Sequence, residues 1–324
     1  MNNQDLLTIN IKKAKNRANQ LLLLLISFFV YVVAIFLLYR LGINSNDLAE
    51  YEIIWGLAVN YDFLTAFSEL RYEIGSLFIF WSLGQFFSAN MTFYIFGFLA
   101  LTTKFYIFKK YLNYPLAAFC LYLVSFVYIL DANAIRIALA ISVVFYALYV
   151  KPQSIYTYLF LTLIAVMFHY SGIIILLLYF IRVPVLGLML FILFGLLFDF
   201  LILNLDLFSF AKIWLTHPNV GQVNITSSLF LMQLCISIIC AYYWHKLSEG
   251  QKKGAYLNMF GVVAYLVFIE NATVAHRLRE LSQIGILSVL FLGERKLTYL
   301  KLSVGVCFSY IAAYNAWHAV GKLI

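Results

Sequence analysis

The sequence predicts an all-α polytopic integral membrane protein with about eleven (roughly 10 to 12) transmembrane helices. Three observations predict this class. First, 64% of the 324 residues are hydrophobic and only 11% are charged, whereas a soluble domain has roughly 25% charged residues. Second, Lys12, Lys13, Lys15 and Arg17 precede the apolar run 21–39, which is long enough to cross a hydrocarbon core of ~30 Å. Third, further apolar runs follow one another without a polar linker.

We therefore expect residues 1–324 to form a single transmembrane domain whose residues 1–20 are cytoplasmic. The predicted crossings lie at 21–40, within 74–103, and at 115–130, 133–150, 155–168, 171–182, 184–204, 227–244, 254–270, 281–292 and 299–320. The longest outer segments are 41–73 and 205–226, which we predict to be periplasmic. Carboxylates alternate with aromatic residues in 41–73. This pattern is typical of a sugar-binding groove and equally of an amphipathic helix at the membrane interface.

The distribution of charge supports this orientation. Fifteen of the 22 lysines and arginines, Lys104 among them, fall on the predicted cytoplasmic side, in agreement with the positive-inside rule. Most acidic residues, including Asp131, fall at or near the outer face. The basic balance is therefore explained by topology, and no nucleic-acid partner is expected. The four cysteines all lie in apolar runs, so neither a disulfide framework nor a metal site is expected, and no motif indicates a cofactor.

Three polar clusters are costly to keep in lipid and need a reason. Arg136 lies in DANAIRIALAIS, His169 in VMFHYSGIIIL, and Arg277 with Arg279 in ENATVAHRLRELSQIGIL. Structural explanations exist for each: Arg136 could reach the interface or pair with Asp131, His169 could join two helices, and the late arginines could hold anionic lipid. However, the topology places all three clusters on the outer face. Guanidinium groups suit a diphosphate, and a neutral imidazole suits removal of a hydroxyl proton.

Four segments carry a family resemblance. They are YEIGSLFIF (72–80), NAIRIALAISVVF (133–145), FHYSGIIIL (168–176) and HRLRELSQIGIL (276–287). In this order they resemble the Wzy-type polysaccharide polymerases, particularly the EpsG-like branch, although Ile74 and Ile137 stand where that branch usually has proline and glutamine. The resemblance implies a C-type glycosyltransferase-like fold in the bacterial inner membrane. It also implies an O-antigen or capsule polymerase that transfers an undecaprenyl-diphosphate-linked glycan onto the next lipid-linked repeat unit at the periplasmic face.

The resemblance and the clusters together define the expected site. His169 is expected to activate the acceptor hydroxyl, with Glu73 as the alternative base, while Arg136 and Arg277 neutralise the diphosphate. The expected substrate-binding residues are Glu73, Tyr72, Asn133, Tyr170, Ser171, Arg279, Glu280 and Asp47. Which of Arg277 and Arg279 faces the site stays open, because they lie two positions apart on one helix. The expected partners are the lipid-linked oligosaccharide, membrane lipids, a chain-length regulator and a flippase.

Three other functions stay open. An O-antigen ligase shares the donor chemistry but has a different acceptor. A metal-dependent C-type glycosyltransferase would use acidic residues of the first loop, such as Glu50 and Glu52, as ligands. A transporter would bind its substrate near the bilayer midplane. The gathering of polar residues at one face, and the absence of an evident repeat between the two halves of the sequence, disfavour a transporter.

Overall fold

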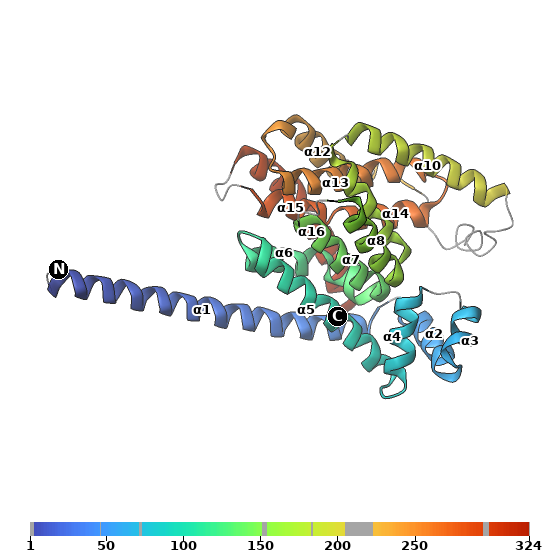
Figure 1. Cartoon of the computed structure of the whole chain (residues 1–324), viewed down its shortest axis with the longest axis horizontal. Helices are drawn as coiled ribbons and strands as arrows, with labels where there is room; N and C mark the ends of the chain where they lie inside the picture. Colours follow the sequence, from blue (N-terminus) through green and yellow to red (C-terminus); the bar gives the residue numbers. More distant parts are fainter. Residues whose placement is uncertain are drawn as a thin grey trace.

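The computed structural model describes residues 3–45, 47–70, 73–150, 154–182, 184–204, 223–293 and 298–323. These residues form helices and no strand (Figure 1). The helices are α1 (Asn3–Gly42), α2 (Leu48–Asn60), α3 (Phe63–Leu70), α4 (Ile74–Gly84), α5 (Ala89–Tyr111), α6 (Pro115–Phe126), η1 (Val127–Asn133), α7 (Ile135–Tyr149), α8 (Ile155–Phe168), η2 (Tyr170–Ile173), α9 (Ile174–Leu177), η3 (Leu178–Arg182), α10 (Pro184–Asn204), α12 (Ser228–Tyr242), η5 (Trp244–Lys246), α13 (Glu249–Val267), α14 (Ala272–Ser282), α15 (Gly285–Phe291) and α16 (Tyr299–Leu323).

The predicted all-α class is confirmed, and two apolar stretches differ in detail. The stretch 74–103 is divided between α4 and α5, because the chain leaves the helix after Gly84 and Ser88 is extended. The predicted crossing 281–292 contains the last two residues of α14, a turn at Gln283 and Ile284, and the short helix α15. Within the described residues, three helices are long and apolar enough to cross a membrane: Gln20–Gly42, Ala89–Tyr111 and Pro115–Asn133. Several shorter apolar helices accompany them, and the number of crossings stays a prediction.

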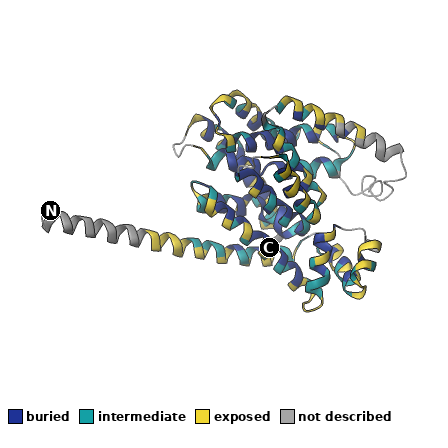
Figure 2. Ribbon diagram, viewed as in Figure 1, coloured by how far each residue is buried: buried dark blue, intermediate teal, exposed yellow. Residues whose placement is uncertain are grey.

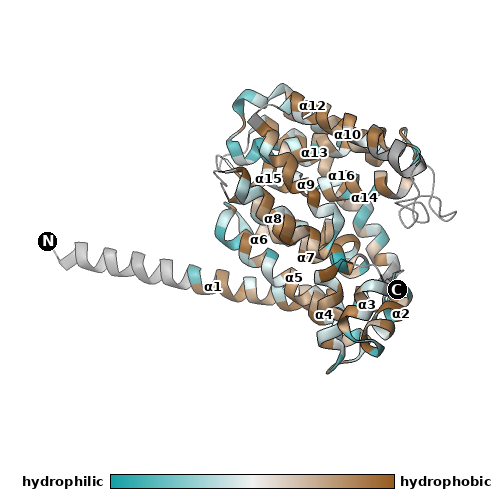
Figure 3. Cartoon of the chain, turned by 45° about the vertical axis from the view of Figure 1, so that its right-hand side comes forward, coloured by the Kyte–Doolittle hydropathy of each residue, from teal (hydrophilic) through white to brown (hydrophobic). Residues whose placement is uncertain are grey.

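Helix α1 extends from the bundle as a long rod (Figure 1). Leu21 to Leu25 are all more than half exposed, whereas Ala34, Leu38 and Leu41 are buried. Figure 2 shows that burial is concentrated inside the bundle, while α1 has exposed stretches along its length. Hydrophobic residues run along most helices, and hydrophilic residues gather towards helix ends and turns (Figure 3). A surface this apolar matches lipid rather than water.

The main core is formed by α5, α6, α7, α13, α15 and their neighbours. Its centre is aromatic: the ring of Phe108 packs edge-on against Phe119, Tyr122 and Phe145. Helices α13 and α15 approach closely at Gly254 and Gly285, where a Cβ atom on either would come within 2.3 Å of the other's carbonyl oxygen. Such close backbone contact between small residues is a common way for helices to pack in lipid.

A second, smaller core joins α2, α3 and α4 to the beginning of α5 and α7. The rings of Tyr51, Phe80 and Phe93 pack against one another at its centre in edge-on and tilted arrangements. Most of the predicted outer segment 41–73 is therefore helical, and Asp62 caps α3 by accepting hydrogen bonds from the backbone N–H groups of Leu64 and Thr65. This lobe lies beside the end of the bundle where α7, α8 and α14 present the candidate site (Figure 1).

One prediction about charge is wrong. Lys104 and Asp131, placed near opposite membrane faces by sequence, form an ion pair with both side chains fully buried. Lys104 lies in the last third of α5, and its long side chain reaches the Asp131 carboxylate of η1. Asp131 is therefore not the partner of Arg136.

Candidate functional site

Five separate segments bring polar side chains together in what we term the arginine cluster: Asp47, Glu73, Arg136, His169 and Arg277. Arg136 Nη1 lies 2.6 Å from Glu73 Oε2, and His169 Nε2 lies 3.9 Å from Glu73 Oε1. Arg277 Nη2 lies 3.6 Å from Asp47 Oδ2. Asn133, on the same segment as Arg136, donates from Nδ2 to Asp47 Oδ2 at 3.3 Å and so connects the Arg136 side of the cluster with the Arg277 side. Glu280 Oε2 lies 3.6 Å from Arg277 Nη1.

Glu73 is the buried centre of the arginine cluster, with 3% of its surface exposed. The residues that follow it explain its position. A Cβ on Gly75 would lie 2.7 Å from the carbonyl oxygen of Met167, so only glycine lets α4 approach the end of α8 this closely. Ser76 Oγ then donates to the carbonyl of Phe168 at 2.7 Å. The first turn of α4 is thereby docked beside His169.

Arg136 projects from the first turn of α7 and its side chain is 15% exposed. Its guanidinium carbon lies 5.7 Å from the ring centroid of Tyr51, in cation–π range. Tyr51 is buried in α2, and sequence reasoning missed this role. The acidic and aromatic pattern of the first outer segment was the available signal, but it did not single out one aromatic residue.

His169 ends α8 in an extended conformation. Its Nδ1 accepts the backbone N–H of Ser171 at 3.2 Å and lies 2.6 Å from Ser171 Oγ. Because a backbone N–H can only donate, Nδ1 is the unprotonated nitrogen, and the neutral ring carries its proton on Nε2, towards Glu73. Burial, followed by the charges of Arg136 and Arg277, lowers the pKa of His169 from its ordinary 6.5 to about 3. The ring is therefore neutral without substrate.

Gly172, the glycine of FHYSG, is also required for steric reasons. A Cβ on Gly172 would lie 2.5 Å from Ala165 Cβ, so the chain can fold back tightly after His169 only without a side chain here. Tyr170, next to His169, is 56% exposed, and no side-chain hydrogen bond or ion pair within the described residues joins it to the arginine cluster. Tyr72 lies outside the described residues, as do positions 205–222 of the predicted outer segment 205–226.

The two late arginines have different environments. The Arg277 side chain is 36% exposed and reaches Asp47 and Glu280. Arg279 is 4% exposed, with its guanidinium carbon 4.9 Å from the ring centroid of Tyr265, and it makes no ion pair with a carboxylate in the described part of the chain. The geometry therefore directs Arg277 to the arginine cluster and Arg279 into the contact between α13 and α14.

The cluster has no surplus of positive charge in this state. Arg136 and Arg277 face three carboxylates, those of Glu73, Asp47 and Glu280. Burial raises the pKa of Asp47, although Arg277 opposes the shift. The contacts of Arg277 at 3.6 Å are longer than good hydrogen bonds. An incoming anion can thus replace these carboxylates at Arg277 at little cost.

No group of three or more histidine, cysteine, aspartate or glutamate side chains in the described ranges has the arrangement of a metal site. Among known proteins, no curated protein and no solved structure matches the chain. The model of the EpsG family matches residues 21–322, which include every member of the arginine cluster. The chain therefore belongs to the EpsG family, a family of polysaccharide polymerase-like membrane proteins.

Proposed function

We propose that this protein is a C-type glycosyltransferase that polymerises lipid-linked repeat units at the periplasmic face of the bacterial inner membrane. The donor is a glycan on undecaprenyl diphosphate, and the acceptor is a hydroxyl of the next lipid-linked unit. One observation carries the proposal: Arg136, Glu73, His169 and Arg277, from four distant segments, meet in one cluster. Two guanidinium groups beside an imidazole suit the transfer of a sugar from a diphosphate.

The proposed step exchanges one bond at the anomeric carbon. The acceptor hydroxyl oxygen forms a bond to this carbon while the bond to the diphosphate oxygen breaks, and the lipid diphosphate leaves with the bonding electrons. Arg136 and Arg277 stabilise the charge that develops on the leaving group. A diphosphate stabilised in this way needs no proton from a general acid. The energy of the sugar–diphosphate bond drives the reaction.

The hydroxyl proton passes to His169. The Ser171 hydroxyl lies 2.6 Å from His169 Nδ1. The acceptor hydroxyl either takes this place or transfers its proton to His169 through the Ser171 hydroxyl. The imidazolium that forms has its Nε2–H directed at Glu73, whose carboxylate stabilises it. Because Arg136 and Arg277 contribute to the low pKa of His169, a bound diphosphate offsets their charge and raises this pKa. The base thus becomes stronger when the donor is bound.

Glu73 is the alternative base. Its Oε2 is occupied by Arg136 at 2.6 Å, whereas His169 Nδ1 faces the Ser171 hydroxyl at 2.6 Å, which is why His169 is preferred. If His169 is the base, replacing it should abolish proton transfer; if Glu73 is the base, a His169 variant should stay active. Both assignments share the same donor and the same role for the arginines.

The test is polymerisation from purified lipid-linked repeat units by His169→Gln and His169→Ala proteins in detergent. Glutamine retains a hydrogen-bond acceptor for the Ser171 backbone but cannot take up a proton near pH 7. Both variants should lose activity about 100- to 10,000-fold, while donor binding persists through Arg136 and Arg277. Near-normal chain growth by His169→Gln would remove His169 from the proton transfer and favour Glu73. A wild-type protein that elongates no glycan would refute the proposed function itself.

A further inference from the structure

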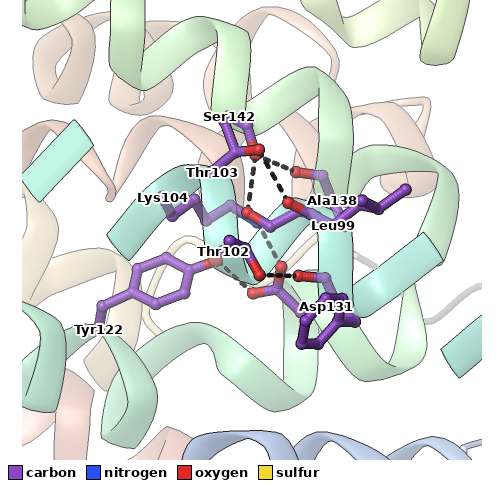
Figure 4. A network of polar contacts seen from close by, with 10 residues as sticks. Leu99, Thr102, Thr103, Lys104, Tyr122, Asp131, Ala138 and Ser142 are labelled. Atoms are coloured by element: carbon purple, nitrogen blue, oxygen red, sulfur yellow. Dashed lines mark hydrogen bonds and ion pairs between the residues drawn. The ribbon is translucent and has the colours of Figure 1, made fainter. Parts of the chain in front are cut away.

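A second polar group lies inside the bundle, which we term the Asp131 triad: Lys104 of α5, Tyr122 of α6 and Asp131 of η1 (Figure 4). Lys104 Nζ pairs with Asp131 Oδ1, and the Tyr122 hydroxyl donates to Asp131 Oδ2. The Lys104 ammonium also lies 5.4 Å from the Tyr122 ring centroid. Both charged side chains are fully buried, so the triad touches no solvent and takes no part in the proposed reaction.

The triad holds an irregular element. Residues Val127–Asn133 form a π-helix, a rare conformation that occurs frequently at functional sites. Ala134, with φ −105° and ψ 64°, separates it from α7. At its beginning, Asn315 Nδ2 of α16 donates to the carbonyl of Ser125 at 2.9 Å. Because η1 is short and the helix is interrupted at Ala134, side-chain contacts are needed to fix the rotation of η1 about its own axis.

The same short segment also carries site residues. Asp131 points towards α5 and α6, whereas Asn133, two residues later, contacts Asp47, and Arg136 contacts Glu73. Ser142 Oγ donates to the carbonyl of Ala100 at 3.2 Å and so links α7 to α5. A rotation of η1 would therefore move Asn133 and the start of α7 relative to the fixed neighbours of the arginine cluster.

Stability alone does not require charges at this place. A buried ion pair can often be replaced by apolar residues of similar volume without loss of stability, whereas removal of one partner leaves an uncompensated charge. A carboxylate held by an ammonium and a hydroxyl has a defined direction, which an apolar side chain lacks. We propose that the Asp131 triad is a positioning device that fixes Asn133 and Arg136 for binding of the donor diphosphate. This role rests on the proposed function.

The first test measures geometry without any reaction. Cys120, Cys235, Cys240 and Cys307 are replaced by alanine, and Asp47→Cys and Asn133→Cys introduce a thiol pair at a contact seen in the structure. A short bifunctional thiol reagent should cross-link this pair. Adding Lys104→Met and Asp131→Leu should slow the cross-linking about tenfold or more, since sites of this kind depend on placement within about 0.5 Å. An unchanged rate would overturn the proposal, even if the polymerase activity proved to be absent.

The second test uses the protein with its native site residues. It separates an effect on the position of these residues from an effect on folding stability. Single Lys104→Met or Asp131→Leu changes should lower the thermal unfolding midpoint, whereas the double variant should regain it because no unpaired charge remains. We expect the double variant still to lose about 100-fold in kcat/KM, with donor KM raised. The control is Lys253→Met: Lys253 is another buried lysine, which donates to the carbonyl of Val150 at 2.9 Å at the far end of α7. It should lower the unfolding midpoint without raising donor KM. A double variant with wild-type stability and wild-type kinetics would make the triad merely structural.

Discussion

Glu73 faces two functional groups with its two oxygens, one towards Arg136 and one towards His169. A single carboxylate thereby holds a guanidinium and lies beside the Nε2 side of an imidazole whose Nδ1 is held by Ser171. This arrangement resembles the way a carboxylate orients a catalytic histidine in other enzymes. The chemistry of the site therefore depends on the shape of each side chain and not only on its charge.

Arg136→Lys tests the importance of this shape. Lysine keeps the charge but loses the planar fork that can grip a carboxylate and a phosphate together. We expect about a 100-fold loss of polymerisation in vitro, with unchanged protein abundance in membranes. The matched control is Arg40→Lys, an exposed arginine at the end of α1, which should retain wild-type glycan ladders. Equal activity of the two variants would indicate that Arg136 only anchors the helix.

The low pKa of His169 makes a prediction about pH. In the free protein the ring stays neutral from pH 8 down to well below its ordinary pKa of 6.5, so kcat/KM should show no acidic limb near pH 6.5 from this group. A bound diphosphate raises the pKa, so the acidic limb of kcat should lie at a higher pH than that of kcat/KM. Steady-state rates between pH 4.5 and 8.5 measure both. Contrary evidence would be a kcat/KM limb near 6.5 that matches a His169 titration seen by NMR.

At the scale of elements, close packing of backbones explains why the site has its shape. The first turn of α4 contacts the end of α8 through Gly75 and Ser76, and the chain reverses after His169 through Gly172. These small residues position side chains that they never touch. Their role is to let two helix ends approach each other, which brings Glu73 to His169.

Gly75→Ala should disrupt this approach. The new methyl group would meet the Met167 carbonyl at 2.7 Å, and overpacking of this kind costs about 1–3 kcal/mol. We expect a lower thermal unfolding midpoint and reduced polymerisation. Gly56→Ala in α2 is the control, because its Cβ would meet no atom within 4 Å and alanine stabilises a helix by roughly 0.5–1 kcal/mol relative to glycine. Similar losses in both proteins would argue against the packing explanation.

At the scale of the whole molecule, the order of helices agrees with an arginine cluster on one membrane face. Asp47 precedes α2, Glu73 precedes α4, Arg136 lies in the first turn of α7, His169 follows α8, and Arg277 lies in the middle of α14. The basic residues Lys109 and Lys110 lie at the other end of α5. That the cluster faces the periplasm stays a prediction.

Single cysteines in the cysteine-free protein test that orientation. Asn44→Cys and Asn224→Cys are at exposed positions on the predicted outer side, so a membrane-impermeant thiol reagent should label them in intact spheroplasts. Lys110→Cys, exposed at the end of α5, should be labelled only after lysis. The opposite pattern would invert the topology and place the site in the cytoplasm.

The sequence alone determines the membrane class, most helix positions and the candidate residues. The reason is physical: lipid tolerates few polar groups, so composition and the rare ionisable residues report directly on structure and function. Local sequence also placed Arg277 and Glu280 within reach on one helix, and their contact is confirmed.

The pairing of charges could be read only from the folded chain. Arg136 pairs with Glu73, 63 positions away, and not with the nearby Asp131, which pairs with Lys104. Carboxylates are equivalent candidates by residue type, and the choice depends on which backbones can approach, as at Gly75 and Met167. The same holds for Arg277 and Arg279, because helix periodicity shows that they face apart but cannot show which face meets Asp47.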